Sequence, residues 1–316
     1  MKVLFVASGN KAVGTISAFI SSQYESLQQE GVEMSLFAVR GHGIKGYLKN
    51  LALLRSLIKQ GKPDVVHAHY SACGYLSSIA SLGLRTKVVV SILGSFPKKS
   101  FKLYFVRFCI DHVWNTTIVK SERTRNQLNR NLPVVPNGVN LSQFELINQD
   151  EARRQLGLEP ALKYVIFMSN PSRPEKNYSL AELSVKSLND NTVNLIPVFD
   201  KPHYEVVKYM CAADVLIMTS YNEGSPNVIK EAMACNCPIV TTDVGDVKWV
   251  TDGVEGTYVA STYEPTEIAQ LLRKAVNFPN RTKGREKIIK LKLTTEETAK
   301  RLCGIYSSDV SQRKVS

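Results

Sequence analysis

The stretch ADVLIMTSYNEGSPNVIKEAMACNCPIVTTD, residues 213–243, carries the local pattern on which the fold depends. Its two ends, ADVLIMT and CPIVTTD, are short apolar runs rich in Val and Ile, which is typical of buried strands. Between them, SPNVIKEAMAC has apolar residues at helical spacing. A strand, a helix and a second strand in this order predict two parallel strands of one sheet, because parallel strands need a crossover connection.

The same alternation of strands and helices runs along the chain. We expect further strands at KVLFVAS (2–8), VEMSLFAVR (32–40), DVVHAHY (64–70), KVVVSIL (87–93), TTIVKS (116–121), KYVIFMS (163–169) and NLIPVFD (194–200). One helix is expected over GYLKNLALLRSLIKQG (46–61) and a last one over about 295–308. The predicted fold class is therefore α/β, with parallel sheets covered by helices on both faces.

One segment interrupts this alternation and divides the chain. LPVVPNGVNLSQF, residues 132–144, contains two prolines and the turn pair Asn137-Gly138. The length of 316 residues suits two domains. We predict two Rossmann-like domains, 1–140 and 141–316, facing each other across a cleft, with the last helix crossing back to the first domain. Such sheets bind ligands at the carboxyl ends of their strands.

Composition narrows the class of protein. Apolar residues make up 44% and charged residues 22% of the chain, which excludes a disordered or fibrous protein. The first residues, MKVLFVASGN, are too short an apolar run for a signal peptide and read as a strand, so we expect a cytoplasmic chain. The six cysteines show no C-x-x-C pair and no recurrent spacing with histidine, so no zinc site is expected.

The net positive charge of the chain belongs to its first half. Residues 1–140 contain 18 Lys and Arg against 6 Asp and Glu, whereas residues 141–316 contain 22 of each kind. In PKKSFKLYFVRFCIDHVW, residues 97–114, cations alternate with aromatic residues, as in helices that lie in a lipid headgroup zone. The alternative is an ordinary domain helix with a solvated basic face. A nucleic-acid partner is not expected, because the basic half contains no recognised nucleic-acid module.

Two glutamates stand eight residues apart in the opening stretch. Glu223 lies in the loop after one strand, and Glu231 lies about one turn into the next helix. Between them Gly224, Ser225, Pro226 and Asn227 form the helix start, whose free N–H groups suit an anion or sugar hydroxyls. Carboxylates on either side can accept hydrogen bonds from vicinal hydroxyls of a sugar or ribose. The alternative is a helix whose first turn is only favoured by acidic residues.

This stretch resembles the E-x7-E signature of the retaining group 1 glycosyltransferases, also called family 4, which have the GT-B fold. PNGVN (136–140) is similar to the family's interdomain motif, and SNPSRPEKN (169–177) is similar to its phosphate-binding loop. The resemblance implies that Glu223 faces the donor sugar, that Glu231 holds the nucleotide ribose, and that Arg173 and Lys176 bind the donor phosphates. It also implies that Gly14, in the first loop, approaches the diphosphate.

The sequence departs from this family at two places on the acceptor side. The family usually has a His-Gly pair where Leu93 precedes Gly94 here, and an apolar side chain cannot accept or position a proton. His69, at the end of DVVHAHY, is the nearest replacement by strand position and our candidate catalytic residue beside Glu223; its alternative is a structural role. Trp249 stands where the family usually has a glutamate, which removes a sugar contact or offers a stacking face.

The resemblance and the residues together predict a hexosyltransferase. It would move a sugar from a nucleotide-diphosphate donor, expected to be a UDP-sugar, to a lipid-linked or polysaccharide acceptor, with no metal or other cofactor. The basic half indicates an anionic membrane surface as a partner and a peripheral position on the inner membrane face. The alternatives are a sugar-nucleotide epimerase or hydrolase, and a non-catalytic glycan- or membrane-binding subunit. A dinucleotide-dependent dehydrogenase fits less well, since SGNKAVG lacks the G-x-G-x-x-G spacing.

Overall fold

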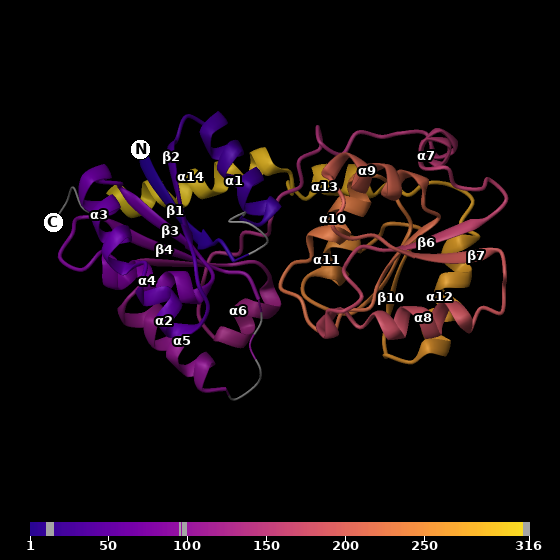
Figure 1. Cartoon of the computed structure of the whole chain (residues 1–316), viewed down its shortest axis with the longest axis horizontal. Helices are drawn as coiled ribbons and strands as arrows, with labels where there is room; N and C mark the ends of the chain where they lie inside the picture. The colour runs from indigo at the N-terminus through magenta and orange to yellow at the C-terminus, as the bar shows by residue number, and fades with distance from the viewer. Residues whose placement is uncertain (11–15, 95, 97–99, 312–316) are drawn as a thin grey trace. The chain divides into compact units, whose positions relative to one another are not determined.

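The computed structural model describes residues 1–10, 16–94, 96 and 100–311. The chain divides into two compact units (Figure 1). Unit 1 comprises Met1–Gly138 together with Thr295–Ser316, and unit 2 comprises Val139–Thr294. Across the described residues, no helix has the length and apolar character needed to cross a membrane.

Unit 1 is built on a five-stranded sheet in the order β2-β1-β3-β4-β5, and every neighbouring pair is parallel. Its strands are β1 (Lys2–Ser8), β2 (Glu33–Val39), β3 (Val65–His69), β4 (Lys87–Ile92) and β5 (Thr116–Val119). The helices are α1 (Ala18–Gln29), α2 (Gly43–Leu48), α3 (Leu51–Gly61), α4 (Ser71–Ala80), α5 (Phe101–His112), α6 (Glu122–Leu128) and α14 (Thr295–Ser311).

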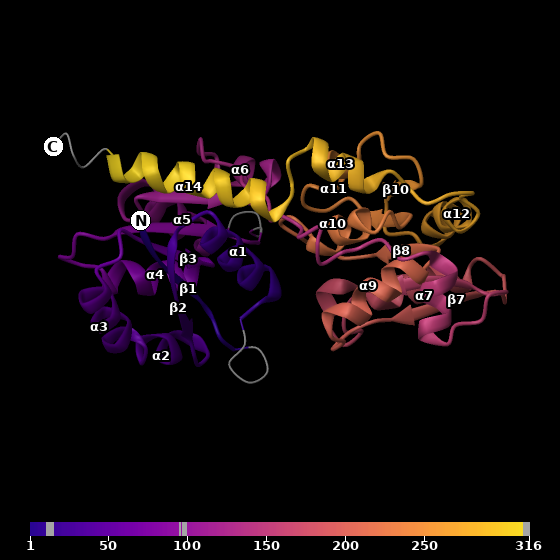
Figure 2. The same ribbon diagram turned by 90° about the horizontal axis from the view of Figure 1, so that it is seen from above.

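Alternation of side chains along the strands gives unit 1 two apolar cores. In β1, Val3 and Phe5 join a core with residues of α1 and α14, whereas Leu4 and Val6 join one with residues of α3, α4 and α5. The helix α14 packs against α1 (Figure 2). Its fully buried Tyr306 completes the first of these cores. The sheet is thus covered on both faces, as continuous apolar strands require.

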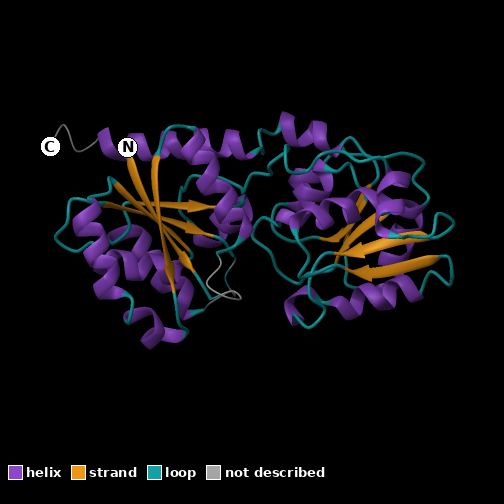
Figure 3. Cartoon of the chain, turned by 45° about the horizontal axis from the view of Figure 1, so that its top comes forward, coloured by secondary structure: helices purple, strands orange, loops and turns teal. Residues whose placement is uncertain are grey.

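Unit 2 repeats this architecture with the strand order β10-β9-β8-β6-β7, again all parallel (Figure 3). Its strands are β6 (Lys163–Phe167), β7 (Val193–Pro197), β8 (Val215–Met218), β9 (Ile239–Thr242) and β10 (Thr257–Ala260). The helices are α7 (Gln149–Leu156), α8 (Tyr178–Lys186), α9 (His203–Ala212), α10 (Asn227–Ala234), α11 (Val247–Thr251), α12 (Pro265–Val276) and α13 (Gly284–Lys290), with the 3₁₀ turn η2 at Pro174–Lys176.

The two faces of this second sheet are also buried. Val165 of β6 faces a core shared with α8 and α12, whereas its neighbour Ile166 faces one shared with α9, α10 and α13. The α/β fold class with two parallel sheets is therefore confirmed.

The helix expected over 46–61 and the strands of unit 2 differ from the sequence prediction. The single helix expected over 46–61 was wrong, because the structure has two helices, α2 and α3, that are separated at Lys49 and Asn50. The side-chain amide of Asn50 donates to the carbonyl oxygens of Arg40 (2.8 Å) and Gly46 (2.7 Å), so it stabilises a turn in place of a continuous helix. The edge strand β10 was not predicted, since its four residues, TYVA, are too short to show a periodicity.

Candidate active site

The Glu223 loop and the basic loop of residues 169–177 meet at the carboxyl ends of two neighbouring strands. The basic loop follows β6 and the Glu223 loop follows β8, and β6 and β8 pair directly in the sheet. After β6 the chain adds β7 on one side, and β8 then forms on the other side of β6. Such a reversal of strand order leaves a crevice at the strand ends, which is where open α/β sheets bind their ligands.

Lys176 and Glu223 form an ion pair at this point. The Lys176 Nζ donates to Glu223 Oε1 at 2.5 Å, and the two side chains are only 19% and 17% exposed. The contact joins residues 47 positions apart. A partly desolvated ammonium beside a carboxylate can bind a sugar phosphate. The ammonium attracts the phosphate oxygens, and the carboxylate accepts hydrogen bonds from the sugar hydroxyls.

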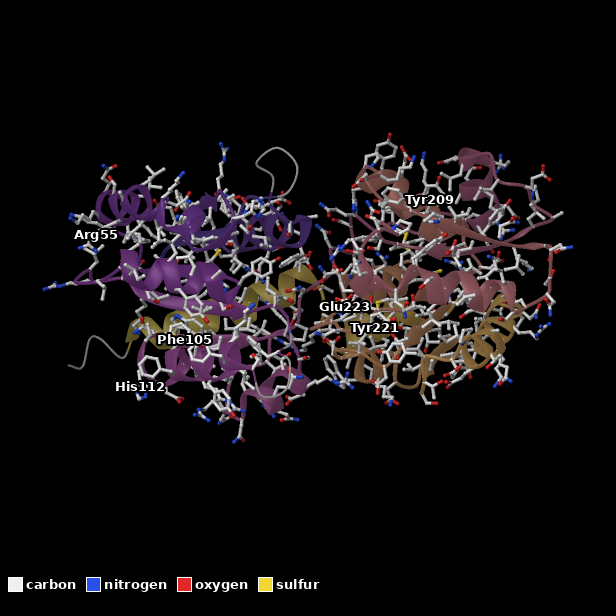
Figure 4. The ribbon with its side chains drawn as sticks, turned by 60° about the horizontal axis from the view of Figure 1, so that its bottom comes forward. Arg55, Phe105, His112, Tyr209, Tyr221 and Glu223 are labelled. Carbon is white, nitrogen blue, oxygen red and sulfur yellow. The ribbon has the colours of Figure 1, made fainter. Side chains whose placement is uncertain are left out.

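Hydrogen bonds hold the two loops together behind this pair. The Thr219 hydroxyl donates to the carbonyl oxygens of Lys176 (3.1 Å) and Asn177 (2.8 Å). The Tyr221 amide donates to the carbonyl oxygen of Glu175 at 3.0 Å. Figure 4 labels Tyr221 and Glu223, which belong to the same loop. The segment that carries Glu223 therefore also fixes the backbone position of Lys176.

Arg173 lies on the same loop but not in the pair. Its Nε and Nη2 both donate to Glu175 Oε1, at 2.8 and 2.5 Å, and both side chains are exposed. The pKa of the Glu175 carboxyl is lowered, first by its own backbone N–H and then by Arg173. The guanidinium would have to exchange this partner for a phosphate, so its phosphate-binding role stays a prediction.

The predicted helix start is present, and most of it is buried. Gly224, Ser225 and Pro226 are buried, and α10 begins at Asn227. The Ser225 hydroxyl donates to Asp246 Oδ2 at 2.6 Å and accepts from Lys230 Nζ at 2.6 Å. The Ser225 hydroxyl is thus hydrogen-bonded to two other side chains of unit 2.

Lys230, Ser225 and Asp246 form a buried chain that we call the clasp. Lys230 is 1% exposed and Asp246 is 8% exposed. Burial lowers the pKa of the Lys230 ammonium, and burial raises the pKa of Asp246 against the opposing effect of Lys230. Because each charge needs the other in this environment, the clasp ties the loop after β8 to the loop after β9.

The two loops also touch through their backbones. Gly245 has φ +58°, a left-handed conformation that favours glycine. A Cβ built there would lie 2.7 Å from the carbonyl oxygen of Gly224, which is closer than real contacts allow. The segment Val244–Asp246, which we call the VGD segment, thus needs its glycine for this approach.

Glu231 follows Lys230 on α10 and has an altered acidity. Burial raises the pKa of its carboxyl to about 7, and the Lys230 ammonium opposes this shift. A large share of Glu231 is therefore protonated at neutral pH in the ligand-free protein. Hydroxyl donors from a ligand would favour its charged form and lower this pKa.

This shift predicts how the stability of the ligand-free protein depends on pH. Because the pKa of Glu231 is raised on folding, its contribution is fully present below the unfolded value of 4.5 and is lost as pH rises to about 7. The unfolding free energy of the wild type should fall by roughly 2–3 kcal/mol over that range. In Glu231→Gln, which has no carboxyl at this position, this fall should be absent. Urea denaturation at a series of pH values measures this. Glu255→Gln, at an exposed glutamate of unit 2, is the matched control, and equal pH profiles for the two variants would contradict the assignment.

The predicted residues of the first domain belong to unit 1. Gly14 lies outside the described residues. His69 ends β3 and is fully buried, with its ring stacked on His67 at 4.5 Å and edge-on to Phe5 at 4.6 Å. Burial and then the Lys120 ammonium hold the pKa of His69 well below its usual range, so the ring is neutral. Among the described residues neither ring nitrogen has a hydrogen-bond partner.

His67 contrasts with His69 on the same strand. Its Nδ1 lies 2.5 Å from the Tyr306 hydroxyl, and its Nε2 lies 2.8 Å from Ser91 Oγ. His67 therefore has the partners of a structural core histidine, whereas both nitrogens of His69 are buried without a hydrogen-bond partner among the described residues. The catalytic role of His69 stays a prediction.

Sequence reasoning missed Lys230 and Asp246 as members of the site. One signal was present: in VIKEAMA, Lys230 interrupts an apolar helix between two buried strands. A lysine on that face needs a nearby acid, and Asp246 follows the next strand. The pairing itself becomes visible only when β8 and β9 are placed side by side.

Two family models match the chain. The model described as "Glycosyl transferases group 1" matches residues 152–277, and the model "Glycosyltransferase Family 4" matches residues 19–143. The two matches together span most of the chain: the first lies within unit 2, and the second covers most of unit 1.

Curated relatives are similar to parts of the chain. The putative teichuronic acid biosynthesis glycosyltransferase TuaC of Bacillus subtilis is 26% identical over 58% of this chain and 54% of its own length. The N-acetyl-alpha-D-glucosaminyl L-malate synthase of Bacillus anthracis is 21% identical over 65% of this chain and 63% of its own. The lipopolysaccharide glucosyltransferase WaaG of Escherichia coli is 31% identical over 35% of this chain and 28% of its own. The matches with TuaC and the malate synthase span between half and two thirds of those relatives.

Solved structures share the fold over nearly the whole chain. Sucrose-phosphate synthase from Thermosynechococcus elongatus superposes with a TM-score of 0.78 at 15% identity, over 98% of both chains. Anabaena Alr3699/HepE in complex with UDP and glucose has a TM-score of 0.75 at 17% identity, over 98% of this chain and 100% of that one. At such identities the likeness shows the fold.

Proposed function

The chain belongs to the group 1, or family 4, glycosyltransferases of the GT-B fold, and from this premise we propose that it moves a sugar from a nucleotide-diphosphate donor to an acceptor of cell-surface glycan synthesis. The observation that carries the proposal is the Lys176–Glu223 pair at the strand-order reversal of unit 2. Glu231 lies about one turn into α10, the helix that follows the Glu223 loop. These groups match the phosphate, sugar and ribose of one nucleotide sugar.

The donor side of the reaction follows from charge. As the glycosidic bond breaks, negative charge grows on the leaving diphosphate, and a fixed cation stabilises that state more than the ground state. We assign this role to Lys176, with Arg173 as a second cation. The proposal needs no metal cofactor. Glu223 would accept from hydroxyls of the donor sugar, and Glu231 from the ribose hydroxyls.

A UDP-sugar is the proposed donor, and retention of the anomeric configuration is the proposed outcome. Support for UDP comes from HepE, solved in complex with UDP and with UDP-glucose. Support for retention comes from the E-x7-E spacing of Glu223 and Glu231. His69 takes the place of the family's missing histidine in this proposal. Its ring is neutral, so one of its nitrogens has a lone pair that can accept a proton.

The acceptor is proposed to be lipid-linked or a polysaccharide. The curated relatives include proteins named for teichuronic acid biosynthesis and for lipopolysaccharide glucosylation, which supports an acceptor in envelope glycan assembly. The basic first half of the chain supports a position at the inner, anionic face of the membrane.

Nucleotide binding tests the donor assignment. Thermal melting is measured with UDP, GDP and ADP, and we expect UDP to raise the melting temperature most. A ligand at about 100 times its Kd adds about 2.7 kcal/mol to the unfolding free energy. A larger shift with GDP or ADP would overturn the uridine assignment, and no shift with any of them would overturn nucleotide binding.

Product analysis then tests the reaction. NMR of UDP-glucose with and without a lipid-linked acceptor should show an α-linked product only when the acceptor is present. Free glucose at the same rate without acceptor would show a hydrolase, and a changed sugar still bound to UDP would show an epimerase. Tight UDP binding without turnover would indicate a non-catalytic subunit.

A further inference from the structure

We propose that the outward face of α5 docks unit 1 on an anionic lipid surface. This inference rests on the proposed function, which places the acceptor at a membrane. It adds the part of the chain that contacts the lipid. The residues concerned form what we call the aromatic stripe: Phe101, Tyr104, Phe105, Phe108 and His112.

The aromatic stripe is exposed along the whole length of α5. Phe101 is 82% exposed and Phe108 is 53% exposed, and Tyr104 and Phe105 are also exposed. Its members recur every three or four residues and so share one side of the helix. The opposite side buries Leu103, Val106 and Cys109 in the core of unit 1. The helix is therefore apolar on both sides, and only one of them is used for folding.

The rings of the stripe form a continuous row. Phe101 and Phe105 stack at 6.4 Å, Phe105 and Phe108 at 6.4 Å, and Phe108 and His112 lie 5.0 Å apart. Figure 4 labels Phe105 and His112, which lie on the same outward side of the unit. A contiguous apolar patch of this kind on a protein surface marks a site of interaction, because leaving it in water is unfavourable.

The helix is fixed to its unit, so the stripe is a preformed surface. The Arg107 guanidinium donates to the carbonyl oxygens of Gln127 at 2.8 Å and Leu128 at 2.9 Å. Phe105 also packs against Tyr75 of α4 at 5.1 Å. A rigid row of rings suits the lipid interface, where aromatic side chains lie at the level of the headgroups.

The positive charge of this half of the chain favours an anionic lipid surface, and not a second copy of the chain, as the partner of the stripe. Residues 1–140 carry 18 cations against 6 acids, so two such faces would repel each other. Within α5, Lys102 is exposed at the edge of the stripe. The acid of this helix, Asp111, is paired with Arg130 through two contacts of 2.7 Å. Aromatic rings beside the exposed Lys102, in a half of the chain with an excess of cations, complement anionic headgroups.

Vesicle binding tests this proposal. Wild type is sedimented with vesicles of phosphatidylcholine alone and of phosphatidylcholine mixed with phosphatidylglycerol, and we expect binding only to the mixed vesicles. Phe101→Ser/Phe108→Ser should lower the partition coefficient at least about tenfold. Tyr204→Ser, which removes an exposed ring beside Lys208 in unit 2, is the matched control and should bind as wild type does.

A second measurement covers the case in which the double variant fails to fold. In Phe108→Trp, fluorescence should be quenched by brominated phosphatidylglycerol vesicles, and absence of quenching would overturn the proposal. Equal binding to both vesicle types, or unchanged binding of a folded double variant, would also overturn it. A lipid-free dimer that the double variant abolishes would assign the stripe to a second copy instead. Since these assays contain no donor, their failure is separate from failure of sugar transfer to a water-soluble acceptor.

Discussion

Lys176→Ala is expected to lower kcat/KM for sugar transfer about 30- to 150-fold, the equivalent of about 2–3 kcal/mol. The ammonium is the mostly buried cation of the pair with Glu223, so its loss removes a charge-assisted hydrogen bond to the donor phosphates. It also leaves the Glu223 carboxylate without its partner, and an uncompensated anion there repels the diphosphate. Steady-state transfer kinetics with the UDP-sugar measure the effect.

Two further variants separate the role of the cation from general damage. Lys274→Ala, at an exposed lysine of α12, should leave kcat/KM unchanged. Lys176→Ala/Glu223→Gln should lose less than the sum of the two single variants, because the residues contact each other and the second change removes the repulsive anion. Wild-type kcat/KM in Lys176→Ala would exclude this lysine from the donor site.

The fold could be predicted from the sequence wherever strands are buried on both faces. Runs such as KVLFVAS and ADVLIMT are short, continuously apolar and rich in Val, Leu and Ile, which is typical of strands at the centre of a helix-covered parallel sheet. The prediction was wrong at 46–61, where the apolar spacing continues through Asn50 but its side chain binds backbone carbonyls and ends α2. The spacing of apolar residues indicates which side of a helix is buried. The break between α2 and α3 depends instead on the hydrogen bonds of the Asn50 side chain, which this spacing does not reveal.

The site was predictable where two residues are close in the sequence and less so where they meet through the fold. Glu223 lies in the loop before α10 and Glu231 lies about one turn into that helix, so their placement on these two elements could be inferred. That Lys176 meets Glu223 depends on the pairing of β6 with β8. That Arg173 meets Glu175 instead of the pair depends on the tight turn at Pro174–Lys176. Strand order and loop conformation are properties of the whole unit.

Lys230→Met is expected to lower the unfolding free energy of the protein by about 3 kcal/mol at neutral pH. Methionine keeps most of the side-chain volume but removes the charge that balances Asp246, which is 8% exposed. Because the loss leaves Asp246 alone, its raised pKa should rise further, and protonation relieves the penalty. The deficit relative to wild type should therefore be larger at pH above neutrality and smaller as the pH falls. Urea denaturation at several pH values measures both effects.

The double variant Lys230→Met/Asp246→Asn decides whether the clasp is an ion pair or simply well-packed volume. With both charges removed, no buried anion remains, so we expect the double variant to regain much of the stability that the single variant loses. Lys274→Met, at the exposed lysine of α12, supplies the control for the substitution itself. Since the clasp ties the Glu223 loop to the VGD segment, KM for the donor should rise in Lys230→Met beyond what its stability explains. A stability deficit that does not depend on pH would contradict an electrostatic role of the clasp, and so would a double variant no more stable than the single one. In that case, Glu223 would be positioned by Lys176 and the loop backbone alone.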